Sequence, residues 1–180
     1  MATIYTIGHS TRTAAELRDL LAAQSMELLV DVRQFPGSRR FPHFSSTALA
    51  DSLAAAGIDY VHEVDLGGRR RPNPASVNLY WQNASFRAYA DHMAGNEFAQ
   101  ALARLECEAG HRATAIMCAE AVPWRCHRWL IADALVARGH QVVHLLGPGQ
   151  QQAHVLNPHA RVDAHRTVTY PAPLFADQNP

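Results

Sequence analysis

Lysine is absent from this chain of 180 residues, so all 16 basic side chains are arginines. A chain without lysine cannot form a lysine Schiff base, and it has neither a P-loop lysine nor a lysine nucleophile. Arginine keeps its charge and binds carboxylates and phosphates through parallel N–H groups. Recognition of anionic groups is therefore open to this chain, although the codon bias of a GC-rich genome explains the missing lysines equally well.

Long apolar runs, a leader sequence and an excess of charge are also missing. No run of 18 apolar residues occurs, and no charged-then-apolar leader is present. These absences predict a cytoplasmic protein without a membrane span. The 16 acidic residues balance the arginines, so no net charge draws the chain to nucleic acid or membranes. Three cysteines, an odd number, argue against a structural disulfide framework.

Short β-branched and aromatic runs alternate with helical patterns along the chain. Strands are expected at residues 4–7, 27–32, 58–62, 113–117 and 141–146. Helices are expected after the capping box of Thr13 and Glu16, from about Ser46 to a cap at Gly57, and over residues 85–94, 97–109 and 127–138, with Asn96 capping the fourth. The alternation predicts a single α/β domain of three layers, with a mostly parallel, doubly wound sheet of Rossmann-like or flavodoxin-like type.

Two segments lack these patterns. Residues 63–83 are rich in turn-forming residues and include three consecutive arginines, and a loop of this length inside a domain is often functional. Residues 148–180 are rich in Pro, Gln and His. We therefore expect an α/β domain over residues 1–147 and a C-terminal tail over residues 148–180 that packs on the domain or extends it.

Polar residues follow several of the predicted strands. His9 comes after the first strand, Asp31 ends the second and Glu120 follows the fourth. Parallel strands bring their carboxyl ends to one edge of a sheet, where ligands usually bind, so these three residues are the catalytic candidates. Asp31 has two interpretations, because Arg33 is on the same side of a strand and can hold it as a structural partner. Otherwise, the carboxylates can divide the roles of acid and base.

Arginines and aromatic residues are interleaved around the same edge. The candidate substrate-binding residues are Ser10, Arg33, Arg39, Arg40, Arg69, Arg70, Trp81, Trp124 and Arg128. Such a combination suits a ligand that carries a phosphate and a base. A solvated loop with aromatic residues folded onto the core is the alternative. Arg125 and Arg128 are also the expected partners of Glu120, if that carboxylate is structural.

Two of the three cysteines lie in the stretch from Met117 to Arg128. Cys118 ends the fourth strand, and Cys126 begins the following helix, where the pKa of a thiol is lowered. Together with His127 they could form a reversible disulfide site or bind a metal. The C-x7-C-H spacing is not an established zinc pattern, however, and no C-x2-C pair occurs. Buried, unreactive cysteines are the third interpretation, and Cys107 is expected in the core.

Several motifs occur in a specific order along the chain. They are Thr6-Ile-Gly-His-Ser10, Asp31-Val-Arg33 with Pro36 and Ser38, Leu66-Gly-Gly68, Phe86-Arg-Ala-Tyr-Ala90 with Met93, and Met117-Cys-Ala-Glu-Ala with Cys126-His-Arg128. From about residue 4 to residue 146 the chain resembles the DUF488 family. The resemblance implies a compact α/β domain and no particular activity, because the family has no assigned function. It also implies a branch-specific role for the cysteines, since a divergent branch lacks the two-cysteine motif.

Hydrolysis of an N-glycosidic bond in nucleic acid or a nucleotide is the first functional hypothesis. Arginines would hold phosphates, a base would stack near Trp81 or Trp124, and Asp31 or Glu120 would activate water or stabilise an oxocarbenium-like state. Such a DNA glycosylase would be monofunctional, because the lyase step needs a lysine.

Two alternatives come from other classes of protein. One is redox chemistry or metal binding through the two cysteines and His127, and the other is a module that binds an anionic nucleotide without turnover. The first hypothesis requires no cofactor. Its expected partner is a nucleic acid or nucleotide rather than a membrane, and the sequence leaves the oligomeric state open.

Overall fold

A six-stranded sheet forms the centre of this computed structural model, which describes residues 1–37 and 39–173. The strand order is β3-β2-β4-β1-β5-β6, and the bounds are β1 Thr3–Gly8, β2 Leu28–Asp31, β3 Asp59–His62, β4 Thr114–Cys118, β5 Gln141–Gly147 and β6 Gln150–Ala153. The first five strands pair in parallel, and β6 runs antiparallel to β5. Ser38 of the family motifs and residues 174–180 of the expected tail lie outside the described residues.

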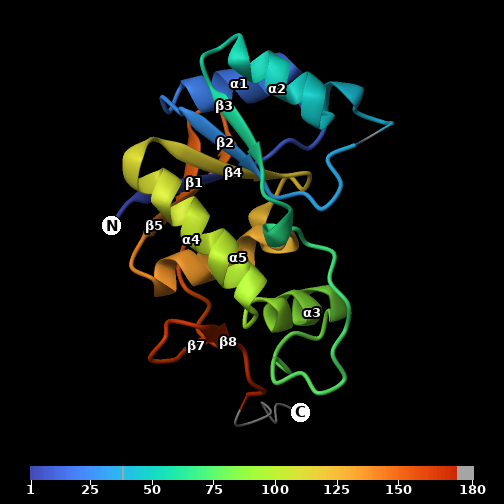
Figure 1. Ribbon diagram of the computed structural model, residues 1–180, viewed down its shortest axis with the longest axis vertical. Helices are drawn as coiled ribbons and strands as arrows, with labels where there is room; N and C mark the ends of the chain where they lie inside the picture. The colour runs from blue at the N-terminus through green and yellow to red at the C-terminus, as the bar shows by residue number, and fades with distance from the viewer. Residues whose placement is uncertain (38, 174–180) are drawn as a thin grey trace.

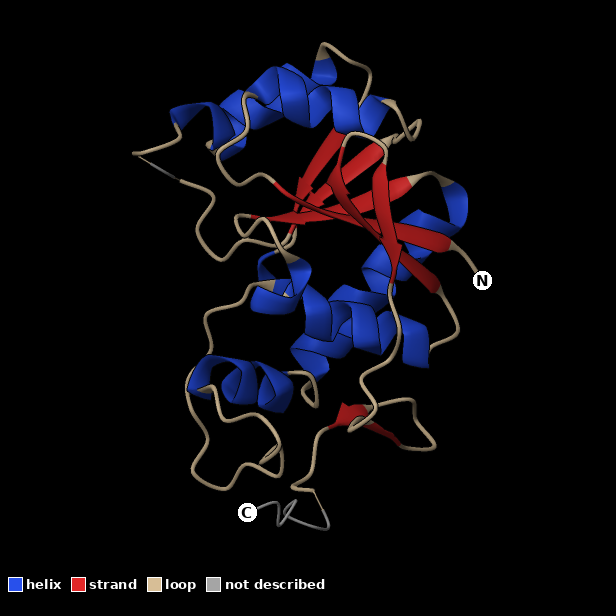
Figure 2. Cartoon of the chain, turned by 180° about the vertical axis from the view of Figure 1, so that it is seen from behind, coloured by secondary structure: helices blue, strands red, loops and turns tan. Residues whose placement is uncertain are grey.

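Helices cover both faces of the sheet. Their bounds are α1 Ala14–Ala22, α2 Ser46–Ala54, α3 Ala84–His92, α4 Asn96–His111 and α5 Arg128–Ala137, with short 3-10 turns at η1 Pro42–Phe44, η2 Val64–Leu66 and η3 Pro123–Arg125. Figures 1 and 2 show α1 and α2 on one face and α4 and α5 on the other, with α3 farther from the sheet. The predicted three-layer, mostly parallel α/β fold is confirmed. No helix in the described part of the chain is both long and apolar enough to cross a membrane.

Each face of the sheet has its own apolar core. Leu17 of α1 and Leu49 of α2 pack in one cluster with Ile7 and Met117 of the sheet. The other cluster joins α4 and α5 to alternate residues of the same strands, including Ile116. Neighbouring residues of β4 thus enter opposite cores, as side-chain alternation along a strand requires.

Local signals account for most helix starts. Thr13 and Glu16 form the predicted capping box of α1, and the hydroxyl of Ser45 accepts a hydrogen bond at the start of α2. The prediction for α4 is wrong in detail. Asn96 is its first residue, Gly95 stands at the cap without a side-chain bond, and the helix continues through Gly110 to His111.

The C-terminal segment contains strands that the sequence pattern did not predict. The residues of β6 are all exposed, so this edge strand has no apolar alternation to reveal it. Farther on, β7 Arg161–Val162 and β8 Val168–Thr169 form a small hairpin beyond α5 (Figure 2). Tyr170, which follows β8, is fully buried in the core cluster that includes α5. The segment is therefore anchored to the face opposite α1 and α2.

The loops after β1 and β4 touch although the two strands send the chain to opposite faces. The N–H of His9 donates to the carbonyl of Cys118 at 2.9 Å, and that of Ser10 donates to the carbonyl of Ala119 at 3.0 Å. Gly8 permits this approach, because a Cβ atom there would overlap the main-chain oxygen of Glu120. In an open α/β sheet, the point where neighbouring strands diverge in this way is the usual position of a binding crevice.

We predict that Gly8→Ala destabilises the protein by about 3 kcal/mol or more, because the new methyl group must displace main chain rather than a flexible side chain. Gly110→Ala is the matched control, since a Cβ atom there meets nothing within 4 Å and lies in a helix. It should be neutral or stabilise by up to about 1 kcal/mol. Urea denaturation measures both variants, and equal effects would contradict the close-approach argument.

Candidate functional site

A pocket of about 460 Å³ opens at the carboxyl edge of the sheet, beside the point where β1 and β4 diverge. Its walls come from the loop after β2, the Gly68 region, the start of α3 and the segment from Cys118 to His127. The side chains with chemical capacity that line it are Arg33, Arg69, Cys118, Glu120, Arg125, Cys126 and His127. This pocket thus contains the two cysteines and the histidine of the predicted motif.

The two cysteines of the motif are in contact. Their sulfur atoms lie 2.6 Å apart, and both residues are free cysteines buried at the pocket. Side chains in contact can close a disulfide without a large movement of the main chain. Cys107, by contrast, is exposed on α4, so its predicted core position is wrong.

The two thiols have different pKa values because their surroundings differ. Burial and the hydrogen bond to Cys126 raise the pKa of Cys118 well above its usual value. Burial also acts to raise the pKa of Cys126, but its hydrogen bond with Cys118 and the charge of Arg128 outweigh that effect and lower the pKa to about 7. Cys126 is therefore the thiol that ionises first.

The cation next to the cysteine pair is Arg128, and only 1% of this residue is exposed. Its Nε donates to Cys118 Sγ at 2.9 Å, Nη1 to Thr6 Oγ1 at 3.1 Å and Nη2 to the main-chain oxygen of Glu120 at 2.6 Å. No carboxylate among residues 1–37 and 39–173 forms an ion pair with it. Because a buried charge needs compensation, the two cysteine sulfurs are the adjacent groups that can carry its counter-charge.

His127 presents a base to the thiol. Its Nε2 lies 2.9 Å from the carbonyl of Val32, so it carries the proton that this hydrogen bond requires. Burial lowers the pKa of His127, which favours the neutral ring. Nδ1 is then an acceptor, and it lies 3.5 Å from Cys126 Sγ. Gly68 leaves room for this ring, because a Cβ atom there would overlap it. The Leu-Gly-Gly sequence is the signal that could have revealed this role.

Asp31 and Arg33 form a separate buried cluster. Nη2 of Arg33 donates to Asp31 Oδ2 at 2.6 Å, and the hydroxyl of Tyr60 donates to the same oxygen at 2.7 Å. The carboxylate of Asp31 is fully buried and does not line the pocket. Burial, followed by the nearby charge of Asp31, raises the pKa of Tyr60. The structure therefore shows the pairing with Arg33 that the two-residue spacing predicted.

His9 lies beside this cluster and outside the pocket lining. Its ring contacts that of Phe44 at a tilt of 31°, with ring centroids 4.4 Å apart, and its Nε2 is 3.3 Å from Nη1 of Arg33. Burial is the main cause that lowers the pKa of His9 to about 4, so its ring is neutral at physiological pH. Of the three catalytic candidates, only Glu120 lines the pocket. In the described chain its carboxylate pairs with neither Arg125 nor Arg128, contrary to the interpretation as a structural pair.

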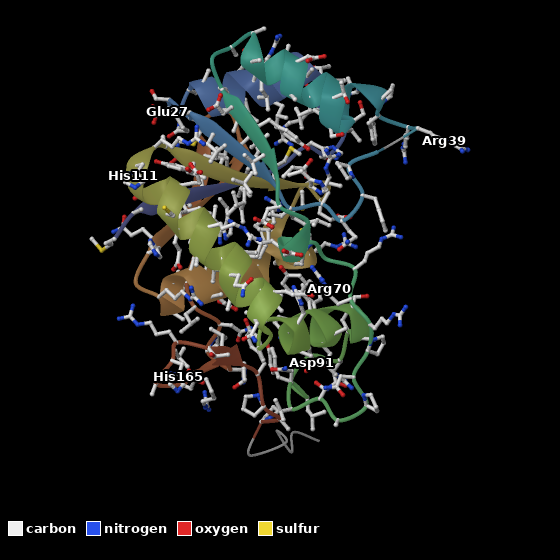
Figure 3. All side chains as sticks on the ribbon, in the orientation of Figure 1. Glu27, Arg39, Arg70, Asp91, His111 and His165 are labelled. Atoms are coloured by element: carbon white, nitrogen blue, oxygen red, sulfur yellow. The ribbon has the colours of Figure 1, made fainter. Side chains whose placement is uncertain are left out.

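The other predicted binding residues are dispersed. Arg69 lines the pocket, whereas Arg70 donates to the carbonyls of Val64, Asp65 and Gly67 and supports its own loop. Figure 3 shows Arg39 extending outward from the loop before η1, far from Arg70. Arg40 contacts the ring of Phe41. The two loops therefore meet at the pocket through Phe35 and Arg69, whereas Arg39, Arg40 and Arg70 lie outside its lining.

The two candidate tryptophans, Trp81 and Trp124, also lie in different places. Trp81 stacks on Phe86 at 5.0 Å and meets Tyr170 edge-on, so it packs against the core. Trp124 is half exposed on η3, next to Arg125. Ser10 has a left-handed backbone with φ of 48° and lies outside the pocket lining. Arg125, which was considered only as a partner for Glu120, does line the pocket.

A metal centre has no ligand set in this part of the structure. Within residues 1–37 and 39–173, no three His, Cys, Asp or Glu side chains are grouped as metal ligands would be. The site as described consists of two sulfur atoms, an imidazole and a buried guanidinium.

We predict that Asp31→Asn destabilises the protein by about 3–5 kcal/mol, because it leaves the buried guanidinium of Arg33 without its carboxylate. Asp59→Asn is the matched control. It removes a carboxylate from an ion pair with Arg112 in which Asp59 is 72% exposed, and it should change stability little. Thermal unfolding measures both variants. A stable but inactive Asp31→Asn protein would instead indicate that Asp31 acts in the chemistry.

The comparisons with known proteins identify a family and no characterised relative. The family described as domain of unknown function DUF488 matches residues 13–135. Neither a curated protein nor a solved structure matches the chain. The matched region contains Asp31, the pocket loops and the whole cysteine motif. Because it covers more than half of the sequence, the chain belongs to the DUF488 family.

Proposed function

We propose that the protein is a thiol–disulfide oxidoreductase in which Cys126 attacks and Cys118 resolves. The observation that carries this proposal is the contact of the two sulfur atoms at 2.6 Å at the wall of a pocket. A buried arginine and a neutral histidine on either side supply the charge and the base that thiol chemistry needs.

The exchange proceeds in two balanced steps. The Cys126 thiolate attacks one sulfur of a substrate disulfide, the substrate S–S bond breaks, and a mixed disulfide and a free thiolate result. Cys118 then passes its proton to the first released thiolate and attacks the sulfur of Cys126, which breaks the mixed disulfide and releases the second half of the substrate as a thiolate. Two electrons have passed to the substrate, and the protein holds a Cys118–Cys126 disulfide. A small dithiol reverses the sequence and regenerates the protein.

His127 is placed to move the proton. Its Nδ1 accepts the proton of Cys126 before attack and can return it to the departing thiolate, so no net proton stays on the ring. Arg128 keeps its charge through both steps, because its pKa lies far above physiological pH. It stabilises whichever sulfur carries the negative charge.

We predict that iodoacetamide alkylates one thiol of the wild-type protein with a pH midpoint near 7, as the lowered pKa of Cys126 requires. Cys126→Ser should abolish this reaction, while Cys118→Ser should keep a reactive thiol and accumulate a mixed disulfide with oxidised glutathione. Peptide mass mapping identifies the labelled and linked cysteines.

Cys107→Ser is the matched control, because Cys107 is exposed and distant from the motif. It removes only the label on Cys107 itself and should leave the alkylation of Cys126 and the formation of the Cys118–Cys126 disulfide unchanged. Unaltered reactivity in Cys126→Ser, or an oxidised wild type without a Cys118–Cys126 link, would sink the proposal.

The pocket favours a small anionic substrate. Arg69 and Arg125 line it and form no ion pair with any described residue, while Glu120 is the one acidic side chain among the lining residues. The lining also includes Ser85, in the first turn of α3, where the positive end of the helix dipole favours negative charge. A volume of about 460 Å³ is within the usual range of small-molecule sites.

We predict that Arg69→Gln and Arg125→Gln each raise the KM for oxidised glutathione, which carries carboxylates, by up to about five-fold. The KM for cationic cystamine should not rise, since the lost charge repelled it. Arg39→Gln is the control, because Arg39 is exposed and lies outside the pocket lining. Equal changes for both substrates would argue against charge selection.

A nucleotide-binding module is the second candidate. Phe35 is 66% exposed at the pocket, and the guanidinium of Arg69 lies 5.6 Å from its ring centre, an arrangement that suits a base beside a phosphate. Tight binding of a nucleotide by a protein that fails to exchange disulfides would favour this function. The glycosidic hydrolysis expected from the sequence stays a hypothesis, and the burial of Asp31 leaves Glu120 as its one carboxylate at the pocket.

A further inference from the structure

A continuous chain of hydrogen-bonded, buried side chains leads from Arg128, beside the cysteines, to Asp133 in the middle of α5. Four hydrogen bonds connect it, from Arg128 Nη1 to Thr6 Oγ1 at 3.1 Å, Thr6 Oγ1 to His144 Nδ1 at 2.7 Å, His144 Nε2 to His154 Nδ1 at 3.0 Å and His154 Nε2 to Asp133 Oδ1 at 2.8 Å. Each of the five residues is at most 8% exposed. These residues come from β1, β5, α5 and the segment after β6, and the proposed exchange uses none of them except Arg128.

The cation at one end of this hydrogen-bonded chain and the carboxylate at the other indicate the direction in which each bond donates. Asp133 accepts three hydrogen bonds, from His154, the N–H of Asn157 and the hydroxyl of Tyr170, which is the pattern of an ionised carboxylate. His154 donates to this carboxylate through Nε2, and in the tautomer with a lone pair on Nδ1 it accepts there from Nε2 of His144.

The same logic continues to the cysteine pair. Burial, followed by the charges of His154 and Arg128, lowers the pKa of His144 to about 3, so its ring is neutral and its Nδ1 accepts. Thr6 then donates its hydroxyl proton to His144 and accepts from Arg128. All four bonds point from the cation to the carboxylate, an arrangement in which each bond polarises the next.

Packing fixes the histidines in this arrangement. Trp129 stacks on His144 with ring centroids 5.4 Å apart and meets His154 edge-on at 4.4 Å. The rings therefore have little freedom to turn and break the chain. The carboxylate end is held by Asn157 and Tyr170 of the C-terminal segment.

We propose that the side chains of Thr6, His144, His154 and Asp133 are positioning residues of the thiol site, which hold the Arg128 guanidinium against the cysteine sulfurs. This inference rests on the proposed function. Among the described residues no carboxylate contacts Arg128, and the chain supplies one at a distance through Thr6, His144 and His154. The C-terminal segment, through its bonds to Asp133, is consequently a part of the site rather than an appendage.

Thr6→Val tests the centre of the chain, because it keeps the shape of the side chain and removes the hydroxyl. Arg128 should lose its orientation on the sulfur atoms, so the pH midpoint of Cys126 alkylation should rise and the rate at pH 7 should fall about five-fold. Thr6→Ser retains the hydroxyl and should restore the wild-type profile. His154→Phe breaks the far end, preserves a ring against Trp129 and should shift the midpoint in the same direction.

Glu106→Gln is the control for general destabilisation. It breaks the partly buried ion pair with Arg138 at the end of α5 without touching the chain. The proposal is overturned if Thr6→Val and His154→Phe fold and keep the wild-type midpoint, or if Glu106→Gln moves it equally. If Thr6→Val does not fold, His154→Phe decides. If the wild type alkylates with the pH midpoint of an ordinary thiol, the proposed function itself fails. A wild-type midpoint near 7 that the variants leave unchanged overturns only the role of the hydrogen-bonded chain.

Discussion

The buried guanidinium of Arg128 is the interaction on which the site depends. It joins three elements at once, because its donors reach Thr6 of β1, Cys118 of β4 and the main chain at Glu120, while its own backbone begins α5. A lysine could not replace it, since one ammonium group cannot present a planar set of donors to three separate acceptors. Its burial is tolerated because a sulfur or oxygen atom accepts from each of its three nitrogens, and two of these acceptors belong to the segment between Cys118 and Glu120.

The second polar cluster, which is the ion pair of Asp31 and Arg33, supports the main chain rather than the cysteines. This ion pair is buried at the edge of the pocket, which Arg33 helps to line, and two imidazoles hold the main chain of this segment. His127 bonds to the carbonyl of Val32 and His62 to that of Arg33, at 2.9 and 2.8 Å. Both residues stand beside the segment that presents Gln34 and Phe35 to the pocket. The carboxyl edge therefore divides into a rigid support under β2 and a reactive part under β4.

Structural features that depend on residues close together in the sequence could be predicted from it. The alternation of apolar runs indicated the parallel sheet, the Thr13–Glu16 spacing indicated the start of α1, and the two-residue spacing indicated the pair of Asp31 and Arg33. The exposed strand β6 has no such pattern. The chain of Thr6, His144, His154 and Asp133 was also invisible, because its members are far apart in sequence and meet only when β1, β5 and α5 pack. Likewise, Arg70 looked like a ligand-binding cation until its donors were found on three carbonyls of its own loop.

The position of Arg128 also bears on which redox state the protein favours. With a thiolate beside it, the buried cation has a counter-charge, whereas a neutral disulfide removes that partner and leaves the cation in a medium that solvates it poorly. Electrostatics at this contact thus favours the dithiol form. A pair whose reduced state is stabilised in this way has a comparatively high reduction potential, so its disulfide accepts electrons readily. In the proposed exchange, such a bond would be reduced readily in a reducing compartment, which would return the protein to its dithiol form.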